Sequence, residues 1–520
     1  MDSSNDQDDD FLVDWLFRAF VGTSEIHEKN AGKTKRFFTV VNEHVIAPRS
    51  LELPTVELQL LPPKLWQRQG GLNSPLMGGV IGSWQRASKH DDTTTYIEHI
   101  ELQNVRCFEK LEIGFQRGMN ILIGVNGSGK TTILDALAAG LAPFVEMLQP
   151  MEHAQWSFLD KKDVRISGTP KGITPVFEPQ YPAKVIERTQ SGSWPITTTL
   201  KRTGTGRESI IGGFGNSSTT SGEVMQWAVQ EGFDVTLPLV AYYGTERVWQ
   251  GKAEATNQRD DLSRLAGYHD CLEPSANLTN MRSWFRRMEL LGLQDGQIPP
   301  ALEACKRAIL GCLDGFDVVR YDARLNDLAA RSTKTGLFLG FDQLSAGQRN
   351  MLGMVADIAY RAATLNPHFG AEATVQTPGM VLVDELDLHL HPAWQRRIVG
   401  ALQRAFPRMQ FIMTTHSPQV LGAVRHDSIL VLEDGRVYHP PAPTFGRDSN
   451  SILAEILDVS ERPVEAVARI EEVTRLLDDG HYVQARTALD ALAKEWTERD
   501  PDVVRLRNVL SVVERIDASD

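Results

Sequence analysis

Cysteine is scarce in this chain: only four occur among 520 residues, and no two of them form a Cys-x-x-Cys pair. A disulfide framework and a zinc hook both need regularly spaced cysteines, so neither is expected. The chain also lacks an uninterrupted apolar run of about 18 residues, which a membrane-spanning helix would need. Residues 1–10 are acidic and unlike a signal peptide. These absences predict a soluble, cytoplasmic protein in a reducing compartment, with no membrane contact.

Positive charge is also in deficit, since 54 Lys and Arg face 67 Asp and Glu, a net charge of −13. A protein-wide DNA-binding surface is therefore excluded, because such binding depends on neutralising phosphates. Local contact with DNA or RNA remains open, with an ordinary solvated helix face as the alternative. Two local clusters are candidates: Lys29, Lys33, Lys35 and Arg36, and then Arg282, Trp284, Phe285, Arg286 and Arg287.

The most informative segment that is present is residues 124–132, Gly-Val-Asn-Gly-Ser-Gly-Lys-Thr-Thr. It follows a strand-like apolar run and opens a helix-like run. Backbone N–H groups of such a loop, together with the helix N-terminus, bind a polyphosphate. Lys130 would reach the β- and γ-phosphates, and the Thr131 hydroxyl would hold Mg²⁺. The nucleotide-binding candidates are Asn126, Gly127, Ser128, Gly129, Lys130, Thr131 and Thr132.

Two further apolar runs end in polar side chains suited to a nucleotide. Residues 380–383 read as a buried parallel strand and lead into Asp384 and Glu385. Asp384 could hold Mg²⁺, and Glu385 could accept a proton from the attacking water. Residues 411–415 read as another buried strand and deliver His416, a candidate γ-phosphate sensor.

Residues 344–348, Leu-Ser-Ala-Gly-Gln, precede a helical pattern. Free N–H groups, a serine hydroxyl and a helix dipole make a second anion site there. In this order the motifs resemble an ABC-type ATPase head over roughly residues 96–440. The resemblance assigns Walker A to residues 124–131 and the signature to 344–348. Walker B falls at 380–385, a D-loop at Leu386 and Asp387, and His416 becomes the switch histidine.

The resemblance implies a homodimer, formed head to head, in which the signature of one subunit caps the ATP bound by the other. Ser345, Gly347 and Gln348 would then act on the partner's nucleotide. It also implies that Glu385, His416 and Lys130 are the catalytic residues, and that the cofactors are ATP and Mg²⁺.

The stretch between Lys130 and Leu344 is long for a transporter ATPase. Sustained heptads are missing, which argues against a long coiled-coil arm. The RecF-like or SMC-like heads without a long arm remain. Residues 237–249, 384–397 and 414–420 are also similar to the Septu and retron-associated ATPases of prokaryotic defence systems.

Other assignments stay open. In such heads Arg106, within Asn-x-Arg-x-Phe, would stack on adenine, although an ordinary surface arginine is the alternative. Either Gln155 or Asp163 could serve as the Mg²⁺-contacting Q-loop residue. His389 and His391 beside Asp387 invite a zinc interpretation, but third and fourth ligands are missing, so a D-loop role is preferred.

The expected fold class is α/β: an ABC-type P-loop ATPase head with a helical side or lid insertion and a C-terminal helical tail. Residues 204–222, rich in Gly, Ser and Thr, read as a loop. Apolar spacing, Gly480 and Pro501 predict tail helices near 463–478, 481–498 and 501–516. The expected parts are an N-terminal extension (1–95), an ATPase lobe with Walker A and a β insertion (96–250), a helical lid (251–340), a second ATPase lobe (341–445) and a helical docking region (446–520).

No nuclease motif is visible in the sequence, so any cutting chemistry is expected to belong to a partner. The first functional hypothesis is an ATPase that controls a separate effector, such as a nuclease, in anti-phage defence. The alternative is a RecF-like ATPase in DNA repair or maintenance.

Overall fold

The structure is a computed structural model that describes residues 26–31, 34–41, 44–45, 95–148, 159–171, 174–191, 194–205, 210–212, 217–245, 263–274, 278–457, 460 and 462–517. Most of the expected N-terminal extension lies outside these residues, as do Gln155 and Lys33. The chain divides into two compact units, Met1–Gly446 and Arg447–Asp520.

The first unit is built around a six-stranded sheet with the order β12-β16-β17-β6-β18-β19. All pairs in it are parallel except the last one. Its central strands are short apolar runs buried along their whole length, as expected for a sheet covered on both faces. The strands are β12 (Leu239–Tyr243), β16 (Gly379–Val383), β17 (Met409–Thr414), β6 (Met119–Ile123), β18 (Ile429–Glu433) and β19 (Arg436–Tyr438).

A second, antiparallel sheet has the order β11-β10-β9-β4-β5. Gln410 of β17 pins it to the central sheet, because its side chain bonds to both the N–H and the C=O of Ile97 over 2.8 Å. Strands β9 and β10 of this sheet pair as an antiparallel hairpin within the region where a β insertion is expected. The strands are β4 (Thr95–Val105), β5 (Phe108–Gly114), β9 (Ala183–Ser191), β10 (Trp194–Arg202) and β11 (Ile210–Gly212).

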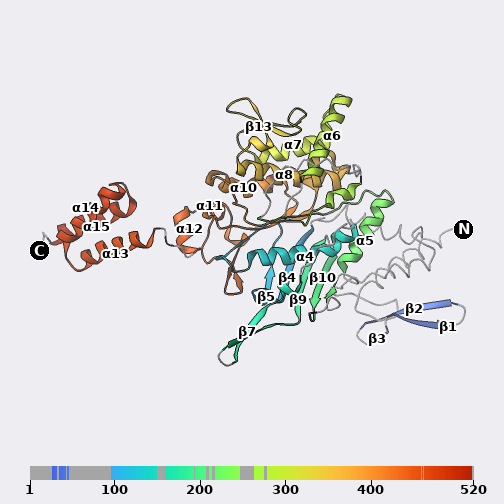
Figure 1. Cartoon of the computed structure of the whole chain (residues 1–520), viewed down its shortest axis with the longest axis horizontal. Coiled ribbons are helices and arrows are strands. Elements are labelled where there is room, and N and C mark those ends of the chain that lie inside the picture. Colours follow the sequence, from blue (N-terminus) through green and yellow to red (C-terminus); the bar gives the residue numbers. More distant parts are fainter. Residues whose placement is uncertain are drawn as a thin grey trace, which may run out of the picture. The chain divides into compact units, whose positions relative to one another are not determined.

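Helix α4 (Lys130–Leu148) lies between these two sheets (Figure 1). It is the one helix among the described residues that is long and apolar enough to cross a membrane, but 78% of the relevant window is buried inside the protein. A core helix has this composition for the same reason, since it is apolar on every side. Helix α5 (Ser217–Gln230) packs beside α4, so the segment read as a loop at 204–222 in fact contains β11 and the start of a helix.

Helices α7 (Pro300–Cys312), α8 (Ala346–Leu365) and α10 (Pro392–Ala405) cover the other face of the central sheet (Figure 1). The side region beyond them is not purely helical, which corrects the expectation for residues 251–340. Helix α6 (Thr279–Asp295) packs there against a small antiparallel sheet. Its strands are β13 (Phe316–Asp322), β14 (Asp327–Ser332) and β15 (Phe338–Gly340).

Smaller elements complete the first unit. A two-stranded hairpin consists of β7 (Ile166–Lys171) and β8 (Thr174–Pro179), and a separate sheet contains β1 (Ile26–Ala31), β2 (Thr34–Val41) and β3 (His44–Val45). Short helices at Ala373–Gln376 (α9) and Pro418–Leu421 (α11) join strands of the central sheet.

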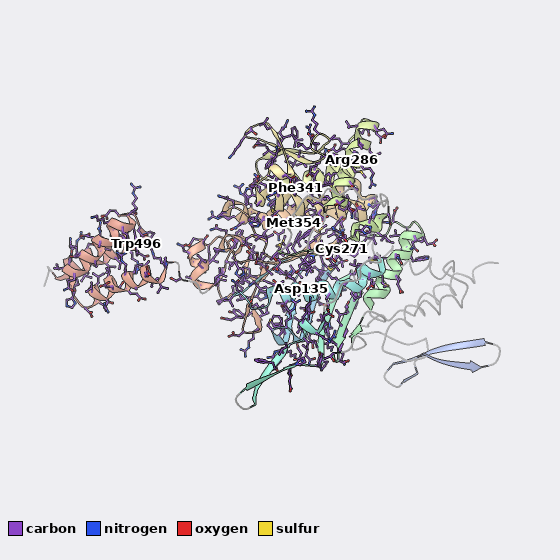
Figure 2. The ribbon with its side chains drawn as sticks, in the orientation of Figure 1. Asp135, Cys271, Arg286, Phe341, Met354 and Trp496 are labelled. Carbon is purple, nitrogen blue, oxygen red and sulfur yellow. The ribbon has the colours of Figure 1, made fainter. Side chains whose placement is uncertain are left out.

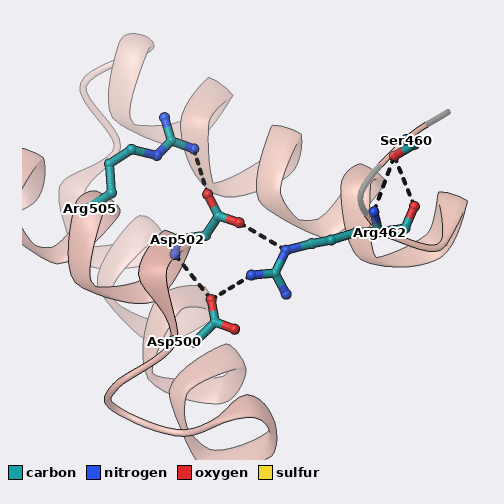
Figure 3. A network of polar contacts seen from close by, with 5 residues as sticks. All are labelled: Ser460, Arg462, Asp500, Asp502 and Arg505. Carbon is teal, nitrogen blue, oxygen red and sulfur yellow. Dashed lines mark hydrogen bonds and ion pairs between the residues drawn. The ribbon is translucent and has the colours of Figure 1, made fainter. Parts of the chain in front are cut away.

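The second unit contains the predicted tail helices, α13 (Val464–Asp478), α14 (Tyr482–Trp496) and α15 (Pro501–Asp517), after the short α12 (Ser449–Glu455). Their apolar faces share one core. Arg462 ties the approach to α13 onto the start of α15, because its guanidinium bonds to Asp500 and Asp502 over 2.7 and 2.8 Å (Figure 3). The same guanidinium stacks on Trp496 at 4.7 Å.

Candidate nucleotide-binding and hydrolysis site

The glycine-rich loop joins β6 to α4, as the sequence predicts. Gly129 has a φ of +105°, and a Cβ on it would lie 2.4 Å from the ring of Phe108, so only glycine fits. Lys130 begins α4 and folds back over the loop, where its Nζ donates to the carbonyls of Gly124 and Val125 over 2.9 and 3.1 Å. Its ammonium therefore stands at the mouth of the loop, where a phosphate would be bound.

The remaining loop residues have distinct environments. Asn126 and Gly127 are exposed, and Ser128 is partly buried with its N–H bonded to Val125 O over 3.2 Å. Burial lowers the pKa of Lys130, while the nearby carboxylates Asp384 and Glu385 raise it. The cation and both Walker B acids are thus close enough to interact.

Asp384 lies at the end of β16 with only 2% of its surface exposed. Its Oδ2 accepts from the Thr131 hydroxyl over 2.7 Å, and its Oδ1 accepts from the Thr414 hydroxyl over 2.5 Å. A carboxylate and a hydroxyl oxygen side by side are the hard ligands that Mg²⁺ prefers. Thr131 and Asp384 therefore fit the ion that the motifs imply.

Glu385 has a left-handed backbone, with a φ of +48°, and its N–H donates to Thr414 Oγ1 over 2.7 Å. A non-glycine residue in this conformation costs of order 1–3 kcal/mol, and such strain clusters at functional sites. This turn follows β16, directly after Asp384.

His416 follows β17, which lies between β16 and β6 in the sheet. Burial lowers the pKa of His416, and the Lys130 charge lowers it further, so the imidazole is neutral near pH 7. Asp387 of the D-loop holds the residue before His416, since its Oδ1 accepts from the Thr415 hydroxyl over 2.5 Å. The structure therefore brings Lys130, Asp384 and His416 to adjacent strand ends, where open α/β sheets bind their ligands.

Arg106 stands between β4 and β5, also with a positive φ, at +46°. Its Nη1 donates to Asp135 over 2.7 Å and its Nε donates to Asp163 over 2.9 Å. Asp135 in turn accepts from the Tyr242 hydroxyl over 2.8 Å. The guanidinium is therefore held in place by two carboxylates, with part of its side chain exposed.

Sequence reasoning did not identify Asp135 (labelled in Figure 2) or Tyr242. A signal for Asp135 was available, since it lies one helical turn after Thr131 and so on the same face of α4. Asp163 is buried and its carboxylate is occupied by Arg106 and the Asp160 N–H. Its assignment to the Q-loop, in competition with Gln155, stays a prediction.

The signature residues begin α8. Ser345 is its N-cap and forms a capping box with Gln348, because each side chain accepts from the other's backbone N–H over 3.3 and 3.0 Å. Ser345 itself is exposed. Gly347 lies against the D-loop, where a Cβ would be 2.5 Å from the carbonyl oxygen of His389. The signature and the D-loop of one chain are therefore in direct contact.

The zinc interpretation finds no support in the described part of the chain, where no group of three His, Cys, Asp or Glu side chains could hold a metal. The His391 ring has another use, since its Nδ1 accepts from the Ala393 N–H over 3.2 Å and caps α10. His389 adopts a positive φ of +62° in the D-loop turn.

The aromatic residues of the cluster at residues 282–287 are buried and cannot stack on bases, whereas contact of its arginines with nucleic acid stays a prediction. Trp284 and Phe285 are buried and pack edge to face, and Trp284 also packs on Tyr360 of α8. Arg282 pairs with Asp327, Arg286 is exposed (Figure 2), and Arg287 is partly buried. Of the other cluster, Lys29, Lys35 and Arg36 fall in β1 and β2, and their side chains are not among those described.

Comparisons with known proteins find matches over most of the chain. A family model described as "AAA domain" matches residues 99–283, and one described as "AAA domain, putative AbiEii toxin, Type IV TA system" matches residues 312–422. The retron Ec83 probable ATPase of Escherichia coli is 26% identical over 450 residues, covering 74% of this chain and 79% of its own length. Septu protein PtuA of Bacillus thuringiensis is 23% identical over 402 residues, covering 74% of this chain and 89% of its own length.

Among solved structures, the Smc head domain of Pyrococcus furiosus with an extended coiled coil superimposes with a TM-score of 0.40 at 15% identity. The alignment covers 70% of this chain and 100% of that one. The chain is therefore similar in sequence to the retron and Septu ATPases, and two of its regions match family models described as AAA domains.

Proposed function

We propose that this chain binds ATP at the loop formed by residues 124–132 and hydrolyses it to ADP and phosphate. The contact between Thr131 and Asp384 carries the proposal, because it joins Walker A and Walker B into one oxygen-lined site. Mg²⁺, when bound, neutralises phosphate charge, and these two residues would hold it. Lys130 binds the phosphates, Glu385 accepts the proton of the attacking water, and His416 contacts the γ-phosphate.

We further propose that two chains assemble head to head and form two composite sites. The exposure of Ser345 at the N-terminus of α8 supports this, because the anion-binding end of that helix is open to a partner. In addition, no hydrogen bond or ion pair joins residues 344–348 to residues 124–132 within the described chain. A two-fold arrangement in which each signature caps the partner's ATP would use both features.

The sequence relatives supply the biological context. Their names place them in retron and Septu systems, so we propose that this chain controls a separate effector, such as a nuclease, in prokaryotic anti-phage defence. We expect no nuclease activity in the chain itself, and we place it in the cytoplasm.

Mixing two inactive variants tests the composite site. Lys130→Ala removes the phosphate contact, and Ser345→Arg places a bulky side chain where the partner's γ-phosphate would lie. Each protein alone should lose ATP turnover. In the mixed dimer one site carries both lesions and the other carries neither, so turnover should partly return.

Ser511→Arg is the matched control, since Ser511 is an exposed serine on α15 in the second unit. That protein should turn over ATP by itself. If no activity returns at any mixing ratio while mixed dimers form, the signature does not act across the dimer. If Lys130→Ala alone hydrolyses ATP normally, the ATPase assignment itself is wrong.

A further inference from the structure

The signature is reached through the side region rather than through the central sheet. Strand β15 ends at Gly340, a single turn of 3₁₀ helix covers Phe341–Gln343, and Leu344 and Ser345 follow at once. The position of Ser345 therefore depends on what holds Phe341.

The turn itself is tightly built. The Gln343 side chain accepts from the Gly340 N–H over 2.9 Å, and the Phe341 carbonyl accepts from the Leu344 N–H over 3.3 Å. The Phe341 ring is fully buried. Because closely packed interiors transmit displacements, a shift of this ring would move the first residues of the signature with it.

Arg282 of α6 holds this ring. Its guanidinium carbon lies 5.2 Å from the centre of the Phe341 ring, a cation–π distance, and its Nε lies 2.8 Å from Asp327 of β14. Both charged side chains are largely buried, with 16% and 14% of their surfaces exposed. A desolvated guanidinium between a carboxylate and an aromatic face has little freedom to move.

The rest of α6 is anchored to the signature helix itself. Trp284 packs edge to face on Tyr360 of α8, with ring centres 5.8 Å apart. Arg282 and Trp284 thus contact the two segments on either side of Ser345. Arg282 contacts the turn before it, and Trp284 contacts the helix after it. Two residues beyond Trp284, Arg286 is exposed and forms no ion pair within the described residues (Figure 2).

We propose that Arg282 is a positioning residue for ATP hydrolysis, which acts through Phe341 to set the signature serine against the partner's nucleotide. This inference rests on the proposed composite site. It assigns to Arg282 a role that differs from a nucleic-acid contact, and it links the Arg282–Asp327 pair to the signature.

The test compares Arg282→Met, which keeps the length and apolar stem but loses the charge, with Arg286→Ala on the exposed face of the same helix. The expected result for Arg282→Met is a fall in kcat of about tenfold or more, because small misplacements of positioned groups are this costly. Binding of a fluorescent ATP analogue to the Lys130 loop should stay near the wild-type value, whereas the thermal unfolding midpoint should fall, because Asp327 loses its buried partner. Arg282→Lys should recover part of the rate, since it restores a cation beside the ring, and Arg286→Ala should change nothing.

Three results would overturn the inference. An unchanged kcat in Arg282→Met, with Ser345→Arg inactive, would reject the role of Arg282 and leave the composite site standing. An active Ser345→Arg protein would reject both the composite site and the role of Arg282. If hydrolysis does not need Ser345, the residue that positions it cannot matter either. A joint loss of kcat, nucleotide binding and thermal stability, without recovery in Arg282→Lys, would reduce Arg282 to a folding role.

Discussion

Thr131 and Asp384 are 253 residues apart in the chain, yet the Thr131 hydroxyl donates to Asp384 Oδ2 over 2.7 Å. The contact exists because β6 and β16 are separated by only one strand, β17, and run parallel, so their carboxyl ends meet at the same edge. The contact therefore joins the two residues of the proposed metal site through the protein's own fold.

Asp384→Asn should therefore impair Mg²⁺ binding more than ATP binding. The amide keeps the shape of the carboxylate but removes the negative charge that the hard cation needs. The expected outcome is turnover that requires much more Mg²⁺, measured by titrating the ion at saturating ATP. Asp295→Asn, an exposed change on α6, is the control. An identical Mg²⁺ titration in Asp384→Asn and the wild type would show that Asp384 does not serve the ion.

Glu385→Gln should give a different defect, with ATP bound but not hydrolysed. Glutamine retains the size and hydrogen bonding of the side chain and cannot accept a proton, so the rate should fall by about 10²- to 10⁴-fold. Chains loaded with ATP should then remain paired, which size-exclusion chromatography with light scattering would detect. A variant that turns over ATP at close to the wild-type rate would remove Glu385 from the role of base.

The candidate nucleotide-binding site could be predicted from the sequence because its residues belong to short, local patterns. Lys130, Asp384 and His416 each follow a buried apolar run, and parallel strands must present such residues at one edge. The tail helices were predictable for a similar reason, since Val473, Leu477 and their neighbours keep one apolar face.

Other features depend on contacts between distant segments, which no local pattern reveals. Helix α5 begins with Ser and Thr, yet it forms because Met225 and Ala228 are buried and Gly222 allows close approach to α4. Strands β13 and β14 carry charged residues, so the sequence does not show the apolar pattern of a strand. The charges pair across the sheet, as Arg331 does with Asp317. The aromatic residues beside Arg282 looked like a surface platform because their burial comes from α8.

Gly347→Ala should uncouple the signature from the D-loop. A Cβ at this position would lie 2.5 Å from the backbone oxygen of His389, so one of the two segments must move. We expect reduced turnover with ATP binding retained, measured by steady-state kinetics and nucleotide titration. Gly311→Ala in α7 is the matched control, since a Cβ there meets nothing within 4 Å. Equal kinetics in both variants would mean that this contact has no part in hydrolysis.

Glu187 should make the stability of the head depend on pH. The residue lies on β9 against the Walker A helix, where its Oε2 would be 2.3 Å from a Cβ on Gly140, and only 2% of it is exposed. Burial raises its pKa from 4.5 to about 8, which the hydrogen bond from Thr189 only partly opposes. Between these values the folded protein keeps a proton that the unfolded chain has released, so stability falls as the pH rises and levels off above about 8. A shift of this size corresponds to a few kcal/mol, at roughly 1.4 kcal/mol per unit.

Glu187→Gln stays neutral throughout, so its thermal midpoint should decline less between about pH 5 and about pH 9 than that of the wild type. Glu178→Gln, at an exposed position on β8, should keep the full decline. If Glu187→Gln loses stability with pH as steeply as Glu178→Gln, the buried carboxyl does not retain its proton at neutral pH.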